Sequence, residues 1–475
     1  MTFSSLTFLF IFFPIIFLLY CVCKNNWIRN IILIIASLLF YAYGEPVAVF
    51  IMLISIILNY LFGLLCGEVF FEKKDSVPKI ARILRKLGLI SAVILNIGLL
   101  FVFKYADFFL ESFGLSNYKL NIALPIGISF FTFQGLSYVV DVYREKKCVQ
   151  KNPFLVMLYI SFFPQLIAGP IVKYHDIKEQ LIQREFSIDR IGAGIQRFIF
   201  GLGKKVLIAG PMGYMVDSVF SLNVSGIGIA SAWIASVSYM LQIYFDFSGY
   251  SDMAIGLGCV FGFDFKENFD KPYTAVNMQQ FWRKWHISLS TWFKEYVYIP
   301  LGGNRKGYTR TYINKFIVFV LTGLWHGANW TFICWGLWHG IALIVEDIIK
   351  RLWNKEKVNS PGWLSVITSV AGHIYSLLFI MITFVVFRAD SIGYALKMIG
   401  KLFYGNGSNA IAFSLLTPDY LIAFMLAIVL ASSLLDKVML KTKTWILRIC
   451  SVFIYIISII MLISGGYNPF IYFRF

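Results

Sequence analysis

Charged residues are scarce in this chain. Asp, Glu, Lys and Arg make up 14% of its 475 residues, and hydrophobic residues make up 59%. Soluble domains carry about 25% charged residues, so this shortage excludes an ordinary soluble globular protein. A mean hydropathy of +0.73 agrees with that exclusion. The composition predicts a polytopic integral membrane protein.

Cysteine is also scarce, and the features of a signal peptide are missing. The seven cysteines are odd in number and lie mostly in apolar runs, which excludes a disulfide framework and a zinc pattern. We therefore expect no bound metal. The first apolar run lacks a basic region before it and ends at Lys24 without a small-residue cleavage site. This pattern excludes a cleavable signal peptide and indicates a first membrane helix.

Acidic residues are too few to balance the basic ones, which number 42 against 25. No basic stripe with a nucleic-acid motif accompanies this surplus, so we expect no nucleic-acid partner. Membrane proteins concentrate Lys and Arg in cytoplasmic loops, where they also meet lipid headgroups. Residues 72 to 88 form such a basic loop. Counting back through three spans from this loop predicts an extracytoplasmic N-terminus.

Long apolar runs are abundant, and a helix of about 20 residues crosses a bilayer. The chain offers about ten to twelve such runs, and it has no internal repeat, low-complexity segment or soluble domain. We predict an all-α polytopic membrane protein, with further re-entrant or interfacial helices around a central funnel. We expect one membrane domain over 1–475, made of N-terminal helices (1–170), a funnel region (171–310) and closing helices (311–475).

Residues 279 to 300 are too polar to face lipid and are rich in aromatic side chains. Helical spacing would put Phe281 and Trp285 on one face and Trp282 and His286 on the adjacent one. Polar backbone at membrane depth is tolerated only where protein or a watery cavity covers it. This segment therefore predicts a re-entrant or interfacial helix that lines the funnel.

His326 lies in one of the most apolar regions of the chain, residues 322 to 330. Ionisable residues inside a membrane are usually functional, because an unpaired one is costly there. Imidazole titrates near neutrality, which suits it to take a proton from a hydroxyl and pass it on. Gly323 and Gly327 allow another backbone or a ligand to approach closely. The alternative interpretation is a histidine packed in an aromatic cluster.

The four other histidines carry weaker signals. His286 is followed one helical turn later by Ser290 and could line a cavity. His339 repeats the Trp-His-Gly triplet of the apolar region, and packing explains it about as well as chemistry does. His175 lies in an amphipathic stretch, where a solvated histidine is expected. His373 lies in an apolar span without polar neighbours, which favours a satisfied core or interfacial histidine.

Two acidic residues, Asp246 and Asp252, lie in an apolar setting. A carboxylate there must be paired, protonated or hydrogen-bonded. Ser248 and the glycine that follows it predict a break in the helix between the two acids. Structural pairing with the basic residues near 197 and 204 is one interpretation. A catalytic role, or cation coordination for transport, is the other.

Several motifs follow one another along the chain: LPIGISFFTFQGLSYVVDVYR (124–144), FPQLIAGP (163–170), YFDFSGYSD (244–252), NFDKPY (268–273), FWRKWHISLSTW (281–292) and TGLWHGANW (322–330). In this order they resemble the membrane-bound O-acyltransferase (MBOAT) family, and more narrowly its bacterial alginate O-acetylation type. The resemblance covers essentially the whole chain.

The resemblance implies a multi-helix fold around a tunnel in a bacterial inner (plasma) membrane. The acyl donor would enter from the cytoplasm and the acceptor from outside. In this family the histidine of the Trp-His-Gly motif is catalytic, which corresponds to His326, and a second family histidine corresponds to His286. We expect His326 to act as general base on an acceptor hydroxyl that attacks the thioester. No permanently bound cofactor is expected, and acetyl-CoA is the expected acyl-CoA donor.

Other residues in these motifs are expected to assist the two histidines. Those expected to position the acceptor or stabilise the oxyanion are Asn329, Ser290, Trp282, Asp246 and Asp252. Those expected to contact donor phosphates or membrane lipids are Arg283, Lys284 and Lys294.

The acceptor is expected to be an extracytoplasmic polysaccharide, either an alginate-like exopolysaccharide or a cell-wall glycan such as peptidoglycan. This family type usually relies on a separate, membrane-anchored, esterase-like (SGNH-type) partner to finish transfer, and we expect one here. An alternative is D-alanyl transfer to teichoic acid from a carrier protein. A polytopic transporter or flippase is the alternative of another class, although it predicts inverted repeats, which the sequence lacks.

Overall fold

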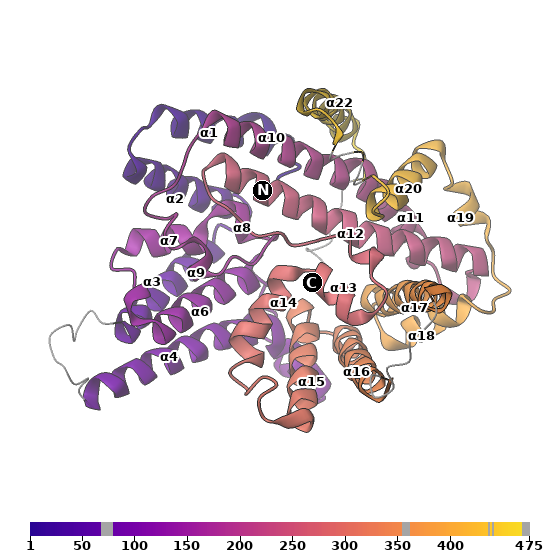
Figure 1. Ribbon diagram of the computed structural model, residues 1–475, viewed down its shortest axis with the longest axis horizontal. Coiled ribbons are helices and arrows are strands. Elements are labelled where there is room, and N and C mark those ends of the chain that lie inside the picture. Colours follow the sequence, from indigo (N-terminus) through magenta and orange to yellow (C-terminus); the bar gives the residue numbers. More distant parts are fainter. Residues whose placement is uncertain (68–78, 354–361, 436–437, 439–440, 468–475) are drawn as a thin grey trace. The chain divides into compact units, whose positions relative to one another are not determined.

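The computed structural model describes residues 1–67, 79–353, 362–435, 438 and 441–467 (Figure 1). Within these residues there is no β-strand, and two isolated backbone bridges join residues 227 and 228 to residues 408 and 406. The all-α prediction is confirmed. The chain forms two compact units: Met1–Phe198 with Tyr250–Lys266, and Ile199–Gly249 with Glu267–Phe475. The division into one membrane domain with three regions stays a prediction.

The first unit is built from helices of the N-terminal part of the chain. Asn25 caps α2 by accepting a hydrogen bond from the Trp27 amide, and Asn152 caps α7, which has a proline at its first position. The helices are α1 (Phe13–Val22), α2 (Asn26–Ala42), α3 (Ala48–Cys66), α4 (Lys79–Leu100), α5 (Ala106–Ser112), α6 (Ile128–Arg144), α7 (Pro153–Ser161), α8 (Phe163–Leu166), α9 (Tyr174–Ile177) and most of α10 (Ile188–Gly203).

The second unit contains the remaining helices, which surround a core of aromatic and aliphatic side chains. Helix α12 (Ile229–Val260) contributes its first part here and its last part to the first unit. The other helices are α11 (Gly210–Phe220), α13 (Met278–Lys284), α14 (Ile287–Phe293), α15 (Gly307–His326), α16 (Trp330–Trp353), α17 (Gly362–Arg388), α18 (Ile392–Lys401), α19 (Ala410–Ser414), α20 (Pro418–Ala431) and α22 (Thr444–Ile463).

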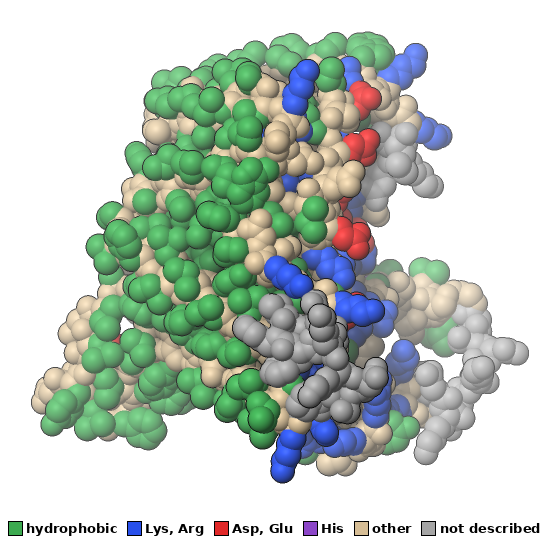
Figure 2. Space-filling view, turned by 90° about the vertical axis from the view of Figure 1, so that its left-hand side faces the viewer, with side chains coloured by type: hydrophobic (Ala, Val, Ile, Leu, Met, Phe, Trp, Pro, Cys, Tyr) green, Lys and Arg blue, Asp and Glu red, His purple; other side chains and the backbone are tan. Residues whose placement is uncertain are grey.

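Among the residues that the structure describes, five helices are long and apolar enough to cross a membrane: Ala48–Cys66, Lys79–Ser112, Trp330–Leu352, Gly362–Arg388 and Thr444–Ile463. Shorter apolar helices occur at Phe8–Val22, Asn26–Ala42 and Pro418–Ala431. Figure 2 shows a face on which hydrophobic side chains cover a broad area, while Lys and Arg gather toward one margin. These features agree with a multi-pass membrane protein, and the number of about ten to twelve crossings stays a prediction.

Only part of the predicted basic loop at 72 to 88 lies in the described residues. Residues 72 to 78 lie outside the described residues. Residues 79 to 88 form the beginning of α4. From residue 79 onward the predicted loop is therefore wrong, because the basic side chains there belong to a helix.

The predicted break between Asp246 and Asp252 is wrong, because α12 continues through Ser248 and Gly249. A methyl group added at Gly249 would lie 2.7 Å from the Gly201 oxygen and 3.1 Å from the Lys205 nitrogen. The glycine therefore serves close helix packing rather than a break in the helix.

The prediction of one helix through residues 279 to 300 is also wrong. Helix α13 ends at Lys284 and α14 begins at Ile287, because His286 adopts a left-handed conformation with φ of 44°. The predicted shared faces of Phe281 with Trp285 and of Trp282 with His286 therefore do not continue into α14. After α14 the chain continues as a π-helix over Lys294–Tyr298, and Ile299 and Pro300 lie in the turn after it.

Helix α13 runs alongside α16. The amides of Met278 and Gln279 donate to the Glu346 carboxylate near the end of α16, at 2.7 and 3.2 Å. One turn later, Trp282 reaches His339 in the middle of α16. This polar, aromatic segment is thus covered by protein, as a re-entrant segment requires.

Helices α15 and α16 form a hairpin with very close backbones. A methyl group added at Gly323 would lie 2.3 Å from the Phe332 oxygen, and one at Gly336 would lie 2.3 Å from the Phe319 oxygen. Only glycine permits this approach. The close approach fixes the end of α15, which carries His326.

Candidate active site

His326 is the last residue of α15, directly before the turn into α16. Its ring packs edge-on against Trp325, Trp335 and Phe387, with centroid distances of 5.0, 5.1 and 5.0 Å. The side chain is 8% exposed. His326 is therefore held rigidly in an aromatic environment that excludes most water.

His286 lies in the bend between α13 and α14 and is fully buried. Its Nδ1 lies 3.1 Å from Asn268 Oδ1, which also accepts hydrogen bonds from the Ser288 hydroxyl at 2.8 Å and the Ser288 amide at 3.3 Å. An amide oxygen only accepts, so the Nδ1 of His286 carries the proton. The lone pair of the imidazole is therefore on Nε2.

The two histidines contact the same indole ring. The centroid of Trp325 is 5.7 Å from that of His286 and 5.0 Å from that of His326. Phe247 of α12 also packs edge-on against His286, at 4.7 Å. The structure thus joins two sequence motifs, residues 281 to 292 and 322 to 330, in one buried cluster.

A cavity of about 470 Å³ lies next to this cluster. Its wall includes Phe387, whose ring contacts His326, and Phe332, whose ring centroid is 4.8 Å from that of Phe387. Polar residues also line it, among them Asn329 and the ion pair of Arg388 with Asp217 at 2.6 Å. The cavity therefore brings polar surface close to a buried imidazole.

His339 has both ring nitrogens in hydrogen bonds. Trp282 Nε1 donates to His339 Nδ1 at 3.2 Å, and His339 Nε2 lies 3.2 Å from the Thr383 hydroxyl. The residue is fully buried. These contacts join α13, α16 and α17, and they favour the packing interpretation of His339.

Asp246 forms a buried ion pair with Lys205, and both side chains are 2% exposed. The pair joins α12 to the segment that connects α10 and α11. Asp252, in the first unit, pairs with Arg197, whose Nη2 and Nε lie 2.9 and 3.1 Å from Asp252 Oδ1. Both carboxylates thus have basic partners, and these lie in the two basic regions, near residues 204 and 197, that the sequence indicated.

The other predicted positions differ in burial and in their partners. Asn329 is half-buried and precedes α16, whose start it caps: its Oδ1 accepts from the Thr331 amide at 3.0 Å. Its Nδ2 donates to the Asp390 oxygen at 3.2 Å. Ser290 has a buried hydroxyl with no hydrogen-bond partner in the described part of the chain. Lys284 donates to the Thr274 hydroxyl at 3.0 Å. Arg283 and Lys294 are exposed.

The two remaining histidines have local partners. His175 is half-buried, and its Nδ1 lies 2.9 Å from Asp141 Oδ2. This hydrogen bond raises the pKa of His175. His373 Nδ1 lies 3.2 Å from the Ala275 oxygen. His175 is therefore more engaged than a solvated histidine, whereas His373 is satisfied as predicted.

The described residues contain no group of three or more His, Cys, Asp or Glu side chains that could hold a metal ion. The family model described as membrane-bound O-acyltransferase matches residues 94–387. The chain belongs to this family. It is therefore an O-acyltransferase of the membrane.

Relatives of this acyltransferase cover most of its length. It is 38% identical over 411 residues to a Pseudomonas putida protein named "probable alginate O-acetylase", covering 85% of this chain and 80% of that protein. It is 36% identical over 440 residues to the peptidoglycan O-acetyltransferase of Helicobacter pylori, with 85% and 80% covered. It is 28% identical over 269 residues to the teichoic acid D-alanyltransferase of Bacillus subtilis, with 53% and 66% covered.

Several residues around the site of the acyltransferase were missed at the level of sequence. Asn268 belongs to a motif that supports the resemblance, but only the fold brings it to His286. Lys205 lies in the basic region near residue 204 that the sequence indicated, but only the fold selects it as the partner of Asp246. Phe387 lies more than 60 residues from His326, and no sequence signal connects them.

Proposed function

We propose that this acyltransferase moves an acetyl group from cytoplasmic acetyl-CoA across the membrane toward hydroxyls of an extracytoplasmic polysaccharide. The observation that carries the proposal is the pair of buried histidines, His286 and His326, which both contact Trp325. The names of the Pseudomonas and Helicobacter relatives support acetyl transfer to a polysaccharide. The acceptor is then an alginate-like exopolysaccharide or a cell-wall glycan.

In the proposed reaction, His326 acts as general base. It removes the proton from an acceptor hydroxyl while that oxygen attacks the thioester carbonyl carbon. The carbon–sulfur bond breaks, and the proton passes to the leaving sulfur, which yields an ester and the free thiol of CoA. General-base help of this kind contributes about 10² to 10⁴ in rate.

His286 positions the acceptor in this proposal. Because its Nδ1 donates to Asn268, its Nε2 can accept a hydrogen bond from an acceptor hydroxyl. Asn329 lines the neighbouring cavity and is an amide donor for the oxyanion. Ser290 is proposed as a further polar contact, and Trp282 acts by fixing His339 and α13.

The charged residues have supporting roles in the proposal. Asp246 and Asp252 act through their ion pairs with Lys205 and Arg197, which hold α12 to neighbouring segments. Three basic residues near α13 and α14 are proposed to contact donor phosphates or lipid headgroups, and two of them are exposed. They are Arg283, Lys284 and Lys294.

Replacing Asn268 with alanine should lower the turnover number about tenfold, because His286 loses the hydrogen bond that fixes its ring and its tautomer. The Michaelis constant for the acyl donor should change little. Kinetics in membranes with labelled acetyl-CoA measure both values. Asn268→Asp keeps the accepting oxygen and should retain more activity than Asn268→Ala; equal losses in both variants would contradict the positioning role.

The proposed location is the inner membrane of a bacterium, with an extracytoplasmic N-terminus. In the second unit, basic residues gather at the start of α15 and the end of α16: Arg305, Lys306, Arg310, Lys315, Lys350 and Arg351. The positive-inside rule assigns this end to the cytoplasm. The opposite end, which contains the turn from α15 to α16 and the end of α17, then faces outward as part of one membrane domain.

We also propose a separate partner at the outer face, a membrane-anchored, esterase-like (SGNH-type) protein. The polymer is outside the membrane, whereas the two histidines are buried. A second protein that finishes transfer to the polymer therefore suits this geometry.

Membranes that contain this protein should transfer label from acetyl-CoA to acetyl esters of extracytoplasmic polysaccharide. They should not transfer label from a D-alanyl carrier protein. Matched membranes without the protein provide the background. Transfer from the carrier alone would favour D-alanylation, and polysaccharide movement driven by an ion gradient without ester formation would favour a transporter.

A further inference from the structure

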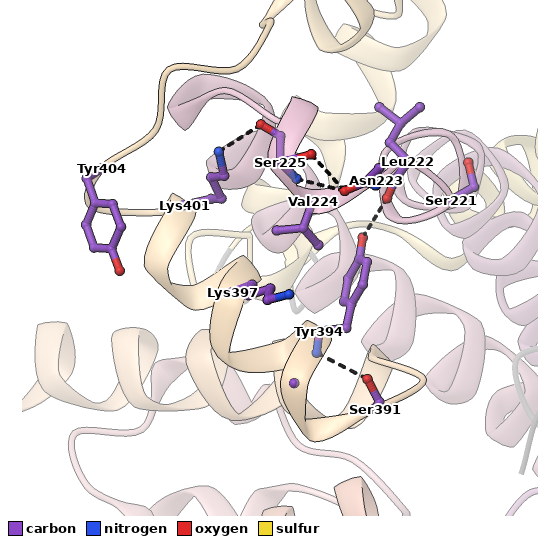
Figure 3. A pocket seen from close by; sticks show the side chains of 11 residues that line it. Ser221, Leu222, Asn223, Val224, Ser225, Ser391, Tyr394, Lys397, Lys401 and Tyr404 are labelled. Carbon is purple, nitrogen blue, oxygen red and sulfur yellow. Dashed lines mark hydrogen bonds between the residues drawn. The ribbon is translucent and has the colours of Figure 1, made fainter.

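A second pocket, of about 730 Å³, lies between the loop that follows α11 and helix α18 (Figure 3). The polar side chains in its lining include Asn223, Ser225, Ser391, Tyr394, Lys397 and Lys401. No Asp or Glu is among the described residues that line it. The pocket therefore offers hydroxyl, amide and ammonium groups without a neutralising carboxylate.

Hydrogen bonds preform the pocket. The Tyr394 hydroxyl donates to the Phe220 oxygen at 2.9 Å, and Lys401 Nζ donates to the Ser225 oxygen at 3.1 Å, so α18 is tied to the loop at two points. Asn223 Oδ1 accepts from the Ser225 amide at 3.1 Å and from its hydroxyl at 2.9 Å. A ligand would therefore enter a site that needs little ordering.

Lys397 and Tyr404 differ from these tied residues. Lys397 is exposed and extends from α18 toward the loop, without a hydrogen bond to the other labelled residues (Figure 3). Tyr404 is 73% exposed and provides an aromatic surface at the edge of the pocket. An ammonium group that already lies over a polar pocket is suited to a carboxylate ligand.

The pocket is next to the route to the catalytic histidine. Ser221 lines both this pocket and the cavity of about 470 Å³ beside the histidine cluster. Phe387 in the wall of that cavity contacts the His326 ring. A glycan held in the larger pocket would thus lie beside the cavity that borders the histidine cluster, where the proposed partner can finish the transfer.

We propose that this pocket binds a carboxylated sugar of the acceptor glycan, which it holds at the outer mouth of the active site. This inference rests on the proposed function, because it identifies the acceptor as an anionic glycan. The pocket volume suits a small number of sugar rings, since ligand sites typically measure about 300–1,000 Å³. Two lysines without a lining acid favour a carboxylated glycan over a neutral one.

The test measures binding of oligouronate fragments of alginate to the purified full chain in nanodiscs, without any acyl donor. The protein should bind oligouronates, should bind neutral cello-oligosaccharides of equal length far more weakly, and should lose oligouronate affinity as salt rises. Equal binding of the charged and neutral sugars would overturn the proposal. Because the assay contains no acyl donor, it measures glycan binding even if the protein does not transfer acetyl groups.

Two variants test whether oligouronates bind in this pocket. Lys397→Gln should weaken oligouronate binding about tenfold, and combination with Lys401→Gln should weaken it further. Lys397 is exposed, so its replacement tests binding even if the loss of the Lys401 tie disturbs the loop. Lys306→Gln, an exposed lysine before α15, is the matched control and should bind as the unmodified protein does. Unchanged binding in Lys397→Gln and in the double variant would overturn the proposal, as would binding only of anionic lipid vesicles or of an acidic partner protein.

Discussion

Replacing His326 with alanine should reduce acetyl transfer by about 10² to 10⁴-fold, because the proposed general base is lost. The aromatic cage of Trp325, Trp335 and Phe387 should remain folded, since the smaller side chain removes no charge partner. The measurement is the rate of labelled acetyl ester formation in membranes that contain equal amounts of each protein.

The matched control is His373→Ala. His373 lies in the same unit, and within the described residues its ring has one hydrogen-bond contact, with the Ala275 oxygen. This variant should retain the transfer rate. Full activity in His326→Ala would contradict the assignment of the base. An equal loss of the transfer rate in both variants would show that any destabilised protein loses activity, so that the loss in His326→Ala says nothing about a base.

Replacing Lys205 with methionine should lower the free energy of unfolding by about 3–5 kcal/mol. The substitution leaves the Asp246 carboxylate without the ammonium that faces it, and both side chains are 2% exposed. Denaturant or thermal unfolding of the detergent-solubilised protein measures this effect.

Two further variants test whether the loss of stability comes from breaking a buried ion pair. The double variant Lys205→Met with Asp246→Leu removes both charges and should recover most of the stability, because an apolar pair of similar volume can replace a buried ion pair. Asp264→Asn breaks the more exposed pair of Arg190 with Asp264 and should cost less than about 1 kcal/mol. A stable but inactive double variant would show that the reaction needs the charged side chains of this pair. The buried-pair argument would be contradicted if Lys205→Met unfolded at the same midpoint as the unmodified protein.

Much of the fold was predictable because membrane helices leave a strong composition signal. The apolar runs predicted an all-α membrane protein, and the ordered motifs predicted the family, which the comparisons confirm. His326 stood out in sequence because an imidazole is unusual in so apolar a segment. These signals depend on local composition, so they do not require knowledge of the packing.

The predictions that failed depended on contacts between distant residues. Gly249 suggested a helix break, but it accommodates a neighbouring backbone inside a continuous α12. His286 was expected on one face of a long helix, but it adopts a left-handed conformation in a bend that the bond to Asn268 holds. Local propensity does not contain these effects, because tertiary packing overrides it.

The sequence by itself determined the class of this protein, its family motifs and the two histidines that most merit testing. Only the tertiary structure decided that Trp325 contacts both His286 and His326, that His339 has partners on both ring nitrogens, and that Asp246 pairs with Lys205. The physical reason is that hydrophobicity is a property of each segment, whereas a site arises when several segments pack together. Close approach at Gly323 and Gly336, which brings α15 against α16, is one such event.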